Sequence, residues 1–361
     1  MSLSAQQEFE QSLKTNIPLA PFTTLGIGGP AKYFAEIKSA DALAAGVEWA
    51  RDQNLPLFVL GGGSNIVVAD RGFRGLVLKV SIDGVETRFE DGYVFIDAGA
   101  GEDWDNLVAL TVANNWAGFE CLSGIPGRVG ATPIQNVGAY GQDISESLVL
   151  LEALDVPRGQ LVQLTANDCD FGYRSSRFKT RDQHRFVITR VKYRLTVDGA
   201  SAVRYPELIR HLGNLQRVTL QQVREAVLDI RRRKAMVIDP TDLDSRSVGS
   251  FFVNPTVTTE QFEEIKQNLA SLASGTDLPA FPAPDGRIKL SAAWLIEKSG
   301  INRGYVYGNV GTSTKHALAI INRVGGTASE ISELKEMIQQ RVFETFGIAL
   351  RPEPVFVGFE K

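Results

Sequence analysis

The stretch Leu55-Pro-Leu-Phe-Val-Leu-Gly-Gly-Gly-Ser-Asn65 joins a short apolar run to three consecutive glycines. Such a run, bounded by proline and glycine, predicts a buried β-strand that ends in a tight loop. Glycines let backbone N–H groups approach an anion closely, and Ser64 and Asn65 add side-chain donors. The stretch therefore predicts a pyrophosphate-binding loop, with a plain tight turn as the alternative. It matches neither Gly-x-Gly-x-x-Gly nor the Walker pattern, which disfavours a standard Rossmann or P-loop fold.

The sequence around this loop alternates between strand and helix patterns. Ser39 is a plausible N-cap for a helix over residues 40–50, and a second strand follows at 75–80. The alternation of apolar and polar residues over 82–99 is typical of an antiparallel sheet. Further strand patterns occur at 148–156 and 185–195 and helix patterns at 102–116 and after Thr219, Thr258 and Thr327. We therefore predict an α+β protein.

A second glycine-rich stretch runs from Ser123 to Gly141 and carries five glycines. A long structured loop inside a compact protein is more often functional than idle. Its small residues would admit a planar ring system edge-on, and Gln135 and Asn136 could bind the polar edge of that ring. An ordered omega-type loop is the alternative. With a third glycine cluster at 26–30, the pattern favours binding of a large dinucleotide.

Composition narrows the class of protein. Hydrophobic residues make up 43% of the 361 residues and charged residues 22%, a composition that disfavours a disordered chain. The net charge of −4 disfavours a nucleic-acid-binding protein. No apolar run approaches the roughly 18 residues of a membrane span. The polar N-terminus resembles neither a signal nor a transit peptide, and two cysteines fit a reducing compartment, so we expect a cytoplasmic protein. Three isolated histidines lack zinc-ligand spacing, so we expect no metal site.

Five motifs, in chain order, together resemble one family. They are Thr24-Leu-Gly-Ile-Gly-Gly-Pro-Ala31, Gly61-Gly-Gly-Ser-Asn65, Ile125-Pro-Gly-Arg-Val-Gly130, Pro133-Ile-Gln-Asn-Val-Gly-Ala-Tyr-Gly141 and Gly249-Ser-Phe-Phe-Val-Asn-Pro255. The ordered set, from about residue 16 to residue 359, is similar to the UDP-N-acetylenolpyruvoylglucosamine reductases, flavoenzymes of bacterial peptidoglycan precursor synthesis. Each motif is moderately specific, whereas the ordered set is highly specific.

The resemblance implies a two-part FAD-binding module of the vanillyl-alcohol-oxidase type followed by a smaller α/β substrate-binding domain. It divides the chain into a first FAD-binding part at 1–80, a second at 81–218 and a substrate domain at 219–348, with the tail 349–361 returning to the first part. It also implies the residues that bind FAD. They are Gly61, Gly62, Gly63, Ser64, Asn65, Gly124, Pro126, Gly127, Gly130, Ala131, Gln135, Asn136, Gly138, Ala139 and Tyr140.

The implied reaction takes a hydride from NADPH through FAD to the enolpyruvyl group of UDP-N-acetylglucosamine enolpyruvate, giving UDP-N-acetylmuramate. Negative charge develops next to the carboxylate, so the site needs an electrophilic group and a proton donor. By their motifs, Arg174 matches the arginine that holds the carboxylate, Ser250 the proton donor and Glu353 the glutamate near the same carboxyl. Arginine suits that position because its planar fork binds a carboxylate with two hydrogen bonds.

Other matches concern substrate binding. They are Tyr173, Tyr205, Lys234, Asn254 and His316. Tyr205 corresponds to a substrate-covering tyrosine of one subclass, and Lys234 and Asn254 match positions that bind the pyrophosphate of the UDP-sugar. Four residues separate Lys234 from Asp239, where that subclass usually has fewer, so the basic run could instead complement a helix dipole. His316 could equally be structural.

Two alternatives remain at this level. One is an FAD-dependent oxidase of the same superfamily that acts on an alcohol or lactone. The other is a nucleotide-sugar binding or regulatory protein that has kept the fold and lost the chemistry, although Arg174, Ser250 and Glu353 are all present. The resemblance favours a monomer that uses small molecules and binds neither nucleic acid nor membrane. No motif separates NADPH from NADH.

Overall fold

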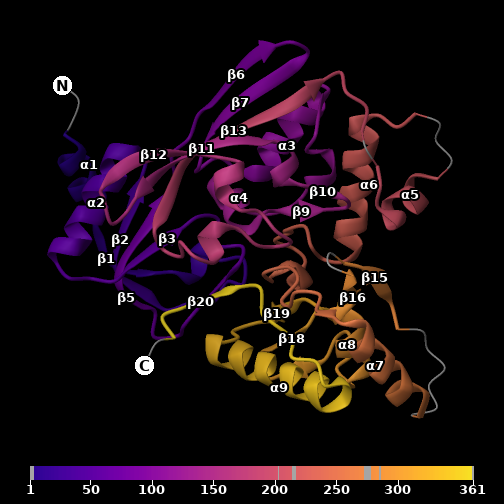
Figure 1. The fold of residues 1–361 in the computed structure, drawn as a ribbon. Helices are drawn as coiled ribbons and strands as arrows, with labels where there is room; N and C mark the ends of the chain where they lie inside the picture. Colours follow the sequence, from indigo (N-terminus) through magenta and orange to yellow (C-terminus); the bar gives the residue numbers. More distant parts are fainter. Residues whose placement is uncertain (1–3, 202, 214–216, 272–277, 284–285, 360–361) are drawn as a thin grey trace. The chain divides into compact units, whose positions relative to one another are not determined.

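The computed structural model describes residues 4–201, 203–213, 217–271, 278–283 and 286–359 (Figure 1). Their contacts divide the chain into two compact units, each with its own hydrophobic core. Unit 1 comprises Met1–Leu19, Pro30–Gly63 and Gly72–Arg233. Unit 2 comprises Ala20–Gly29, Ser64–Arg71 and Lys234–Lys361. The chain therefore leaves unit 1 and returns to it twice before residue 72.

The first sheet of unit 1 is mostly parallel and has the strand order β1-β2-β5-β3. Its strands are β1 (Lys14–Pro18), β2 (Pro30–Ile37), β5 (Phe73–Val80) and β3 (Leu57–Leu60), and it is accompanied by α1 (Ala5–Ser12) and α2 (Ala40–Asp52). Ser39 caps α2 as predicted, because its Oγ accepts the N–H of Ala42 at 3.1 Å. The predicted strand before the glycine loop is β3, but only Leu60 of that strand is buried, since β3 ends the sheet.

The second sheet of unit 1 is antiparallel, with the order β12-β11-β13-β7-β6 and with β8 pairing to β13. Its strands are β6 (Val85–Glu90), β7 (Tyr93–Gly99), β8 (Trp116–Ala117), β11 (Leu148–Asp155), β12 (Gln160–Thr165) and β13 (Phe186–Val197). The alternating pattern of 82–99 is confirmed as the β6–β7 hairpin. Helix α3 (Trp104–Ala113) contributes Trp104 to the core, where Phe119 lies between it and Tyr193.

The second glycine-rich stretch contains little regular structure. It forms short 3-10 turns, η2 (Glu120–Leu122) and η3 (Val129–Ala131), the single turn α4 (Thr132–Gln135) and the ribbon β9 (Gly138–Ala139) with β10 (Gln142–Asp143). After β13, α5 (Pro206–Leu212) packs on α6 (Leu220–Arg233). The capping pattern predicted at Thr219 is confirmed, because its Oγ1 accepts the N–H of Gln222 at 3.1 Å.

Unit 2 combines small sheets with three longer helices. In one sheet, β16 (Ile288–Leu290) lies between β14 (Thr256–Val257) and β15 (Ala280–Pro282). In another, β18 (Val310–Thr312) lies between β17 (Val306–Tyr307) and β19 (Ile320–Asn322). In a third, β4 (Ile66–Val68) pairs with β20 (Val355–Val357). The helices are α7 (Thr259–Ser271), α8 (Ala292–Lys298) and α9 (Ala328–Phe346). Thr327 and Glu330 form a complete capping box at α9, and Gly347 ends that helix with a φ of +67°.

The pairing of β20 with β4 brings the C-terminal tail to a segment from the first fifth of the chain. The predicted three-part division and the compact units differ in four places. Helix α6 packs in unit 1, whereas residues 20–29, residues 64–71 and the tail from residue 349 cluster with unit 2. The functional division at 80, 218 and 348 stays a prediction.

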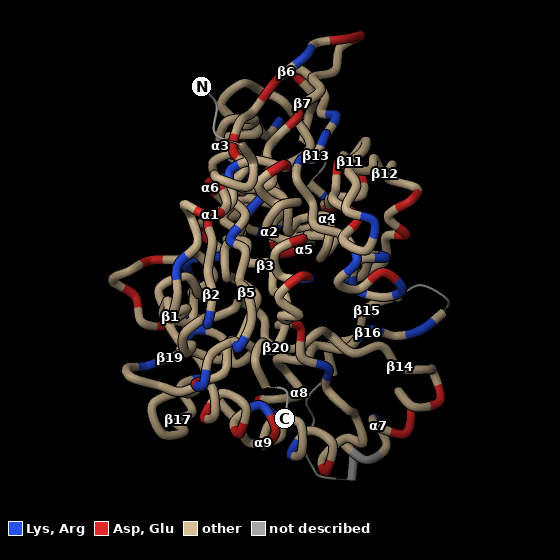
Figure 2. Tube along the Cα trace, turned by 90° about the vertical axis from the view of Figure 1, so that its left-hand side faces the viewer, with Lys and Arg blue, Asp and Glu red and all other residues tan. Residues whose placement is uncertain are grey.

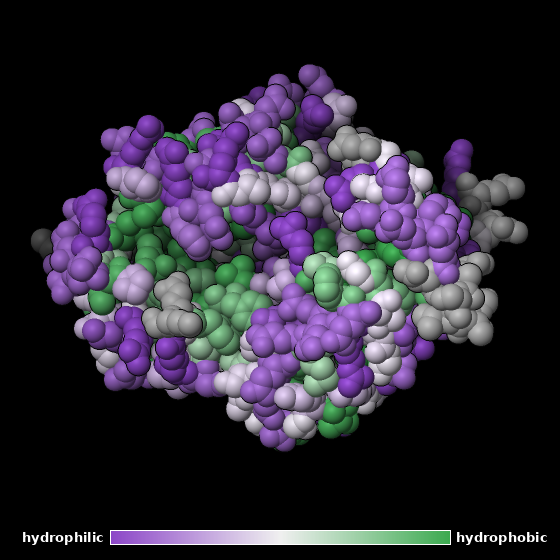
Figure 3. All heavy atoms as spheres, turned by 60° about the horizontal axis from the view of Figure 1, so that its bottom comes forward, coloured by the Kyte–Doolittle hydropathy of each residue, from purple (hydrophilic) through white to green (hydrophobic). Residues whose placement is uncertain are grey.

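Basic and acidic residues are interspersed in both units (Figure 2). Polar side chains dominate the face shown in Figure 3, with apolar residues between them.

Candidate active site

The two glycine-rich loops of unit 1 lie against each other. A Cβ atom on Gly62 would lie 2.8 Å from the Cα of Gly127, a distance at which backbone would have to move. Gly127 has a φ of +135° and Gly63 a φ of +63°, which side chains disfavour. By contrast, a Cβ on Gly61 would meet nothing closer than 3.9 Å. Glycine at 62 is therefore required by the close approach of two loops, whereas a Cβ at Gly61 would make only ordinary van der Waals contact with Arg128.

A partly buried ion pair anchors the second loop. Asp105 of α3 accepts the N–H of Gly124 at 2.6 Å and receives both terminal nitrogens of Arg224, at 2.6 and 2.9 Å. Although burial opposes the charge, the hydrogen bonds from Arg224 and Gly124 lower the pKa of Asp105. From α6, Arg231 donates its Nε–H to the carbonyl of Gly124 at 3.2 Å. Two helices thus hold Gly124 by its N–H and its carbonyl.

The geometry of these loops fits an FAD diphosphate. The two loops approach within contact distance at Gly62 and Gly127 with no side chain between them, which leaves glycine backbone at the surface that a diphosphate would contact. Gly130 packs on Ala100 so closely that a Cβ would lie 2.6 Å from the Cβ of Ala100. Within the described ranges, no group of three or more His, Cys, Asp or Glu side chains is arranged to hold a metal ion.

The two amides predicted to bind the ring edge have partners within unit 1. Asn136, at a φ of +41°, donates its side-chain amide to the carbonyl of Gly172 at 2.9 Å and accepts the N–H of Ser145 at 3.3 Å. Gln135 accepts a hydrogen bond from Lys179 through its Oε1 at 2.8 Å. Asn136 therefore braces the loop that bears Arg174. The cofactor contacts of both amides stay predictions.

Arg174 lies in unit 1 beside the glycine-rich stretch. Its φ of +52° is left-handed, and its Nη2 donates to the carbonyl of Gly138. The guanidinium lies 5.6 Å from the centre of the half-exposed Tyr173 ring. The predicted residues Gly138, Tyr173 and Arg174 are thus brought together in one unit.

A second cluster joins Tyr140, Tyr205 and Arg231. The rings of Tyr140 and Tyr205 meet edge to face, with centres 5.4 Å apart. Burial raises the pKa of Tyr140 to about 12, and its hydroxyl is hydrogen-bonded to Arg231. Burial, with a smaller contribution from Arg174, lowers the pKa of Arg231. Arg231 was not among the predicted site residues, although it lies in the same basic run as Lys234.

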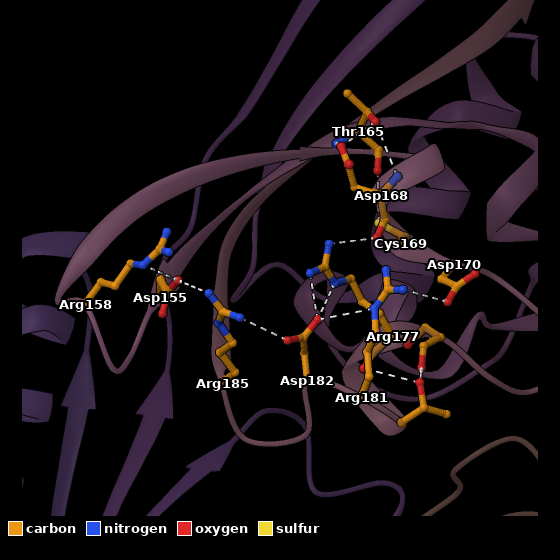
Figure 4. Close-up of polar contacts among 12 residues, drawn as sticks. Asp155, Arg158, Thr165, Asp168, Cys169, Asp170, Arg177, Arg181, Asp182 and Arg185 are labelled. Atoms are coloured by element: carbon orange, nitrogen blue, oxygen red, sulfur yellow. Dashed lines mark hydrogen bonds and ion pairs between the residues drawn. The ribbon is translucent and has the colours of Figure 1, made fainter.

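An ionic network anchors the segment that carries Tyr173 and Arg174 (Figure 4). Arg177 binds Asp182 at 2.6 Å and donates to the carbonyl of Asp168 at 2.9 Å. Asp182 also binds Arg185 at 3.2 Å, and Arg185 binds the buried Asp155 at 2.8 Å. The network connects the loop to strand β11, which contains Asp155. Sequence reasoning missed it, because none of its residues lies in the five motifs of the sequence analysis.

Unit 2 brings Ser250, Glu353 and Asn65 into one place. The N–H of Glu353 donates to the carbonyl of Phe251 at 2.9 Å, directly after Ser250. The side-chain amide of Asn65 donates to the carbonyl of Glu353 at 3.4 Å, and the carbonyl of Asn65 accepts the N–H of Val355 at 3.0 Å. Asn65, predicted to bind the cofactor, therefore also holds the tail that bears Glu353.

Three further residues predicted to bind the substrate lie in unit 2. Asn254 accepts the N–H of Ala292 through its Oδ1 at 3.0 Å, which fixes its amide at the start of α8. His316 is half-buried in a turn, where its carbonyl accepts the N–H of Ala319 at 3.1 Å. Lys234 follows the last residue of α6 and is half-buried. Of the residues predicted to bind FAD, Pro126, Ala131 and Ala139 lie in the second glycine-rich stretch, and Ser64 begins the second segment of unit 2.

A parallel sheet with a glycine loop, followed by an antiparallel sheet with a second glycine-rich stretch, defines an FAD-binding flavoprotein fold. The comparisons agree: a model of the FAD binding domain matches residues 31–165. A model of the UDP-N-acetylenolpyruvoylglucosamine reductase C-terminal domain matches residues 239–357. The predicted α+β fold with an FAD-binding module and a second domain is confirmed.

Relatives over nearly the whole chain identify the family. The UDP-N-acetylenolpyruvoylglucosamine reductase of Thermobifida fusca is 48% identical over 96% of this chain and 98% of its own length. That of Streptomyces coelicolor is 45% identical over 94% of this chain and 89% of its own. The crystal structure of the Thermus caldophilus reductase has the same fold, with a TM-score of 0.63 at 23% identity, covering 96% of this chain and 98% of that one. The chain belongs to the UDP-N-acetylenolpyruvoylglucosamine reductase family.

Proposed function

We propose that this protein reduces UDP-N-acetylglucosamine enolpyruvate to UDP-N-acetylmuramate with NADPH and FAD, in peptidoglycan precursor synthesis. The observation that carries the proposal is the hydrogen bond that joins Glu353 to Phe251, the neighbour of Ser250, in a chain of this family. It joins the backbones of two segments, about a hundred residues apart in the chain, that carry the proposed proton donor and the proposed glutamate of the site.

When bound, FAD supplies the relay that accepts a hydride from NADPH and delivers it to the enolpyruvyl methylene carbon. Residues 61–63 and 124–130 border its diphosphate, where glycines at the closest approach of the two loops keep side chains out. The packing of Gly62 on Gly127 and the anchoring of Gly124 by Asp105 preform this surface. Preformed donors need no rearrangement when the ligand arrives.

Arg174 binds the substrate carboxylate and stabilises the enolate that forms next to it. Its guanidinium is oriented by the carbonyl of Gly138, which accepts a hydrogen bond from Nη2, and by the Tyr173 ring. One terminal nitrogen of the guanidinium is therefore already fixed in position. A guanidinium stays charged throughout the reaction and presents parallel donors to both carboxylate oxygens. It therefore stabilises charge where charge develops in the transition state.

Ser250 donates the proton that completes the reduction at the carbon next to the carboxylate. A serine hydroxyl is a weak acid, so its contribution depends on position against a strongly basic carbanion. Gly249, at a φ of +74°, turns the chain immediately before Ser250, and the Phe251–Glu353 bond fixes the residue after it. By its motif, Glu353 corresponds to the family's glutamate near the substrate carboxyl group.

The partners are small molecules: the UDP-sugar, NADPH and FAD. Tyr205, Lys234, Asn254 and His316 contact the UDP-sugar, and the protein works as a monomer in the cytoplasm, without nucleic-acid or membrane partners. A separate finding concerns the described residues: none of their helices is both long and apolar enough to cross a membrane.

An anaerobic visible spectrum tests the function directly. NADPH is added first to the FAD-loaded protein, followed by UDP-N-acetylglucosamine enolpyruvate. We expect bleaching of the flavin by NADPH and recovery of its colour on addition of the sugar. A protein that takes up no FAD would contradict the proposal, and recovery with oxygen alone would favour the oxidase alternative. Substituting NADH for NADPH in the first step measures the preference between the two nucleotides.

A further inference from the structure

We propose that Lys179 is a positioning residue that sets the orientation of Arg174 relative to the glycine-rich stretch 123–141. The inference rests on the proposed function, because it takes Arg174 as the group that binds the substrate carboxylate. Lys179 itself lies five residues beyond Arg174 and is half-buried. Its role is to bind protein oxygens and thereby hold another side chain in place.

The ammonium group of Lys179 bridges two segments. Its Nζ donates to the carbonyl of Arg174 at 3.1 Å and to Oε1 of Gln135 at 2.8 Å. Gln135 is the last residue of α4, in the stretch proposed to bind FAD. A lysine ammonium carries three donors on a compact charge, which suits simultaneous contacts with two oxygens. One side chain thus connects the substrate-binding arginine to the cofactor-binding stretch.

The hydrogen bond to the carbonyl of Arg174 restrains the backbone from which the guanidinium extends. Arg174 has a φ of +52°, a conformation uncommon for residues with a side chain. Gly172 and Ser175 form a two-way backbone bridge around it, at 3.0 and 3.1 Å, so Arg174 occupies the tip of a tight turn. A bond to its carbonyl fixes the following peptide plane. Since the guanidinium must reach Gly138 from this backbone, a rotation of the plane would displace it.

The neighbouring basic residues Arg177 and Arg181 contact a different part of this segment. Arg177 binds Asp182 and the carbonyl of Asp168, and Arg181 lies 3.5 Å from Asp170 and 3.7 Å from Asp182 (Figure 4). The short contacts of Arg177 anchor the base of the segment, whereas the ion pairs of the mostly exposed Arg181 are surface pairs that contribute little. The two contacts of Lys179 described above instead reach its tip and cross to α4. Arg181 is therefore a control that carries the same charge two residues away without touching Arg174.

The test measures two half-reactions of FAD-loaded protein by anaerobic stopped-flow absorbance. One is flavin reduction by NADPH, and the other is reoxidation of the reduced flavin by UDP-N-acetylglucosamine enolpyruvate. In Lys179→Met we expect reoxidation to slow by about 10- to 100-fold, since a small displacement of a positioned group has effects of that order. NADPH reduction should change much less, because it needs no carboxylate ligand. Arg181→Met should leave both rates near wild type.

A double-mutant cycle with Arg174→Ala separates positioning from general structural support. If Lys179 acts through Arg174, adding Lys179→Met to Arg174→Ala slows reoxidation no further. Additive losses, an equal loss in Arg181→Met, or an unchanged rate in Lys179→Met would each overturn the proposal. Should Lys179→Met fail to fold, Lys179→Gln, which keeps a donor without the charge, enters the same cycle. A wild-type protein whose reduced flavin the sugar does not reoxidise would overturn the proposed function, and this role with it.

Discussion

The backbone N–H of Glu353 donates a hydrogen bond to the carbonyl of Phe251 at 2.9 Å. A second bond, from Val253 to the carbonyl of Arg351 at 3.0 Å, makes this a short antiparallel contact between the tail and the segment that carries Ser250. Phe251 and Phe252 are fully buried on either side of the contact. The position of the proposed proton donor is therefore set by buried aromatic packing and by the last residues of the chain.

Replacing Ser250 with alanine should separate the two half-reactions. We expect flavin reduction by NADPH to proceed near the wild-type rate, whereas reoxidation by the enolpyruvyl substrate should fall by about 10²- to 10⁴-fold, the usual contribution of a positioned proton donor. Rapid-mixing absorbance under anaerobic conditions measures both. Full turnover in Ser250→Ala would remove Ser250 from the proposed mechanism.

Replacing Arg174 with lysine keeps the charge and removes the planar fork. The variant loses a bidentate contact with the carboxylate and the anchor on Gly138, so kcat/KM for the sugar should fall by about 10- to 100-fold, the value of one charged hydrogen bond. Arg88→Lys, in an exposed pair with Glu90, serves as the matched control. Equal activity in both variants would show that a point charge suffices at 174.

The two adjacent glycines predict opposite outcomes. Gly62→Ala places a Cβ 2.8 Å from the backbone of Gly127, so even the FAD-free protein should lose about 1–3 kcal/mol of stability. Gly61→Ala meets nothing within 3.8 Å in the protein, so its FAD-free stability should stay near wild type while FAD affinity falls. Urea unfolding of the FAD-free proteins and fluorescence titration with FAD check the two effects. Unchanged FAD affinity in Gly61→Ala would place the diphosphate elsewhere.

The ionic network predicts a pH dependence of stability. Hydrogen bonds from Arg185 lower the pKa of Asp155, and Arg177 and Arg185 lower the pKa of Asp182 despite its burial. The folded protein therefore binds fewer protons here than the unfolded chain, whose aspartates titrate near pH 3.9. The stabilisation is complete above that pH and is lost as pH falls through the lower, folded pKa values.

Asp182→Asn isolates this contribution. At pH 7 the variant should have a lower free energy of unfolding than the wild type, and the difference should shrink as the pH is lowered toward 3. Urea titrations of both proteins at several pH values measure it. A difference that stays constant with pH would mean that the carboxylate charge does not contribute to stability.

Much of the fold could be predicted because its signals are local. Ser39, Thr219 and Thr327 each cap the helix predicted from them, since a cap and its N–H partner lie three residues apart. The strand before the first glycine loop was predicted as buried, yet β3 lies at a sheet edge with only Leu60 buried. Its apolar composition indicates a strand but carries no information on which neighbours cover it.

The sequence by itself determined the order of the motifs, the family and the positions of the two glycine-rich loops. The tertiary structure decided which residues meet: Asn65 with Glu353, 288 positions apart, and Lys179 with Gln135, 44 apart. It also decided that Asp105 and Arg224 hold the second loop, although no motif marks either of them. The physical reason is that periodicity and capping report contacts within a few residues. Contacts between distant segments depend on how sheets and helices pack, and the residues that make them need no local pattern.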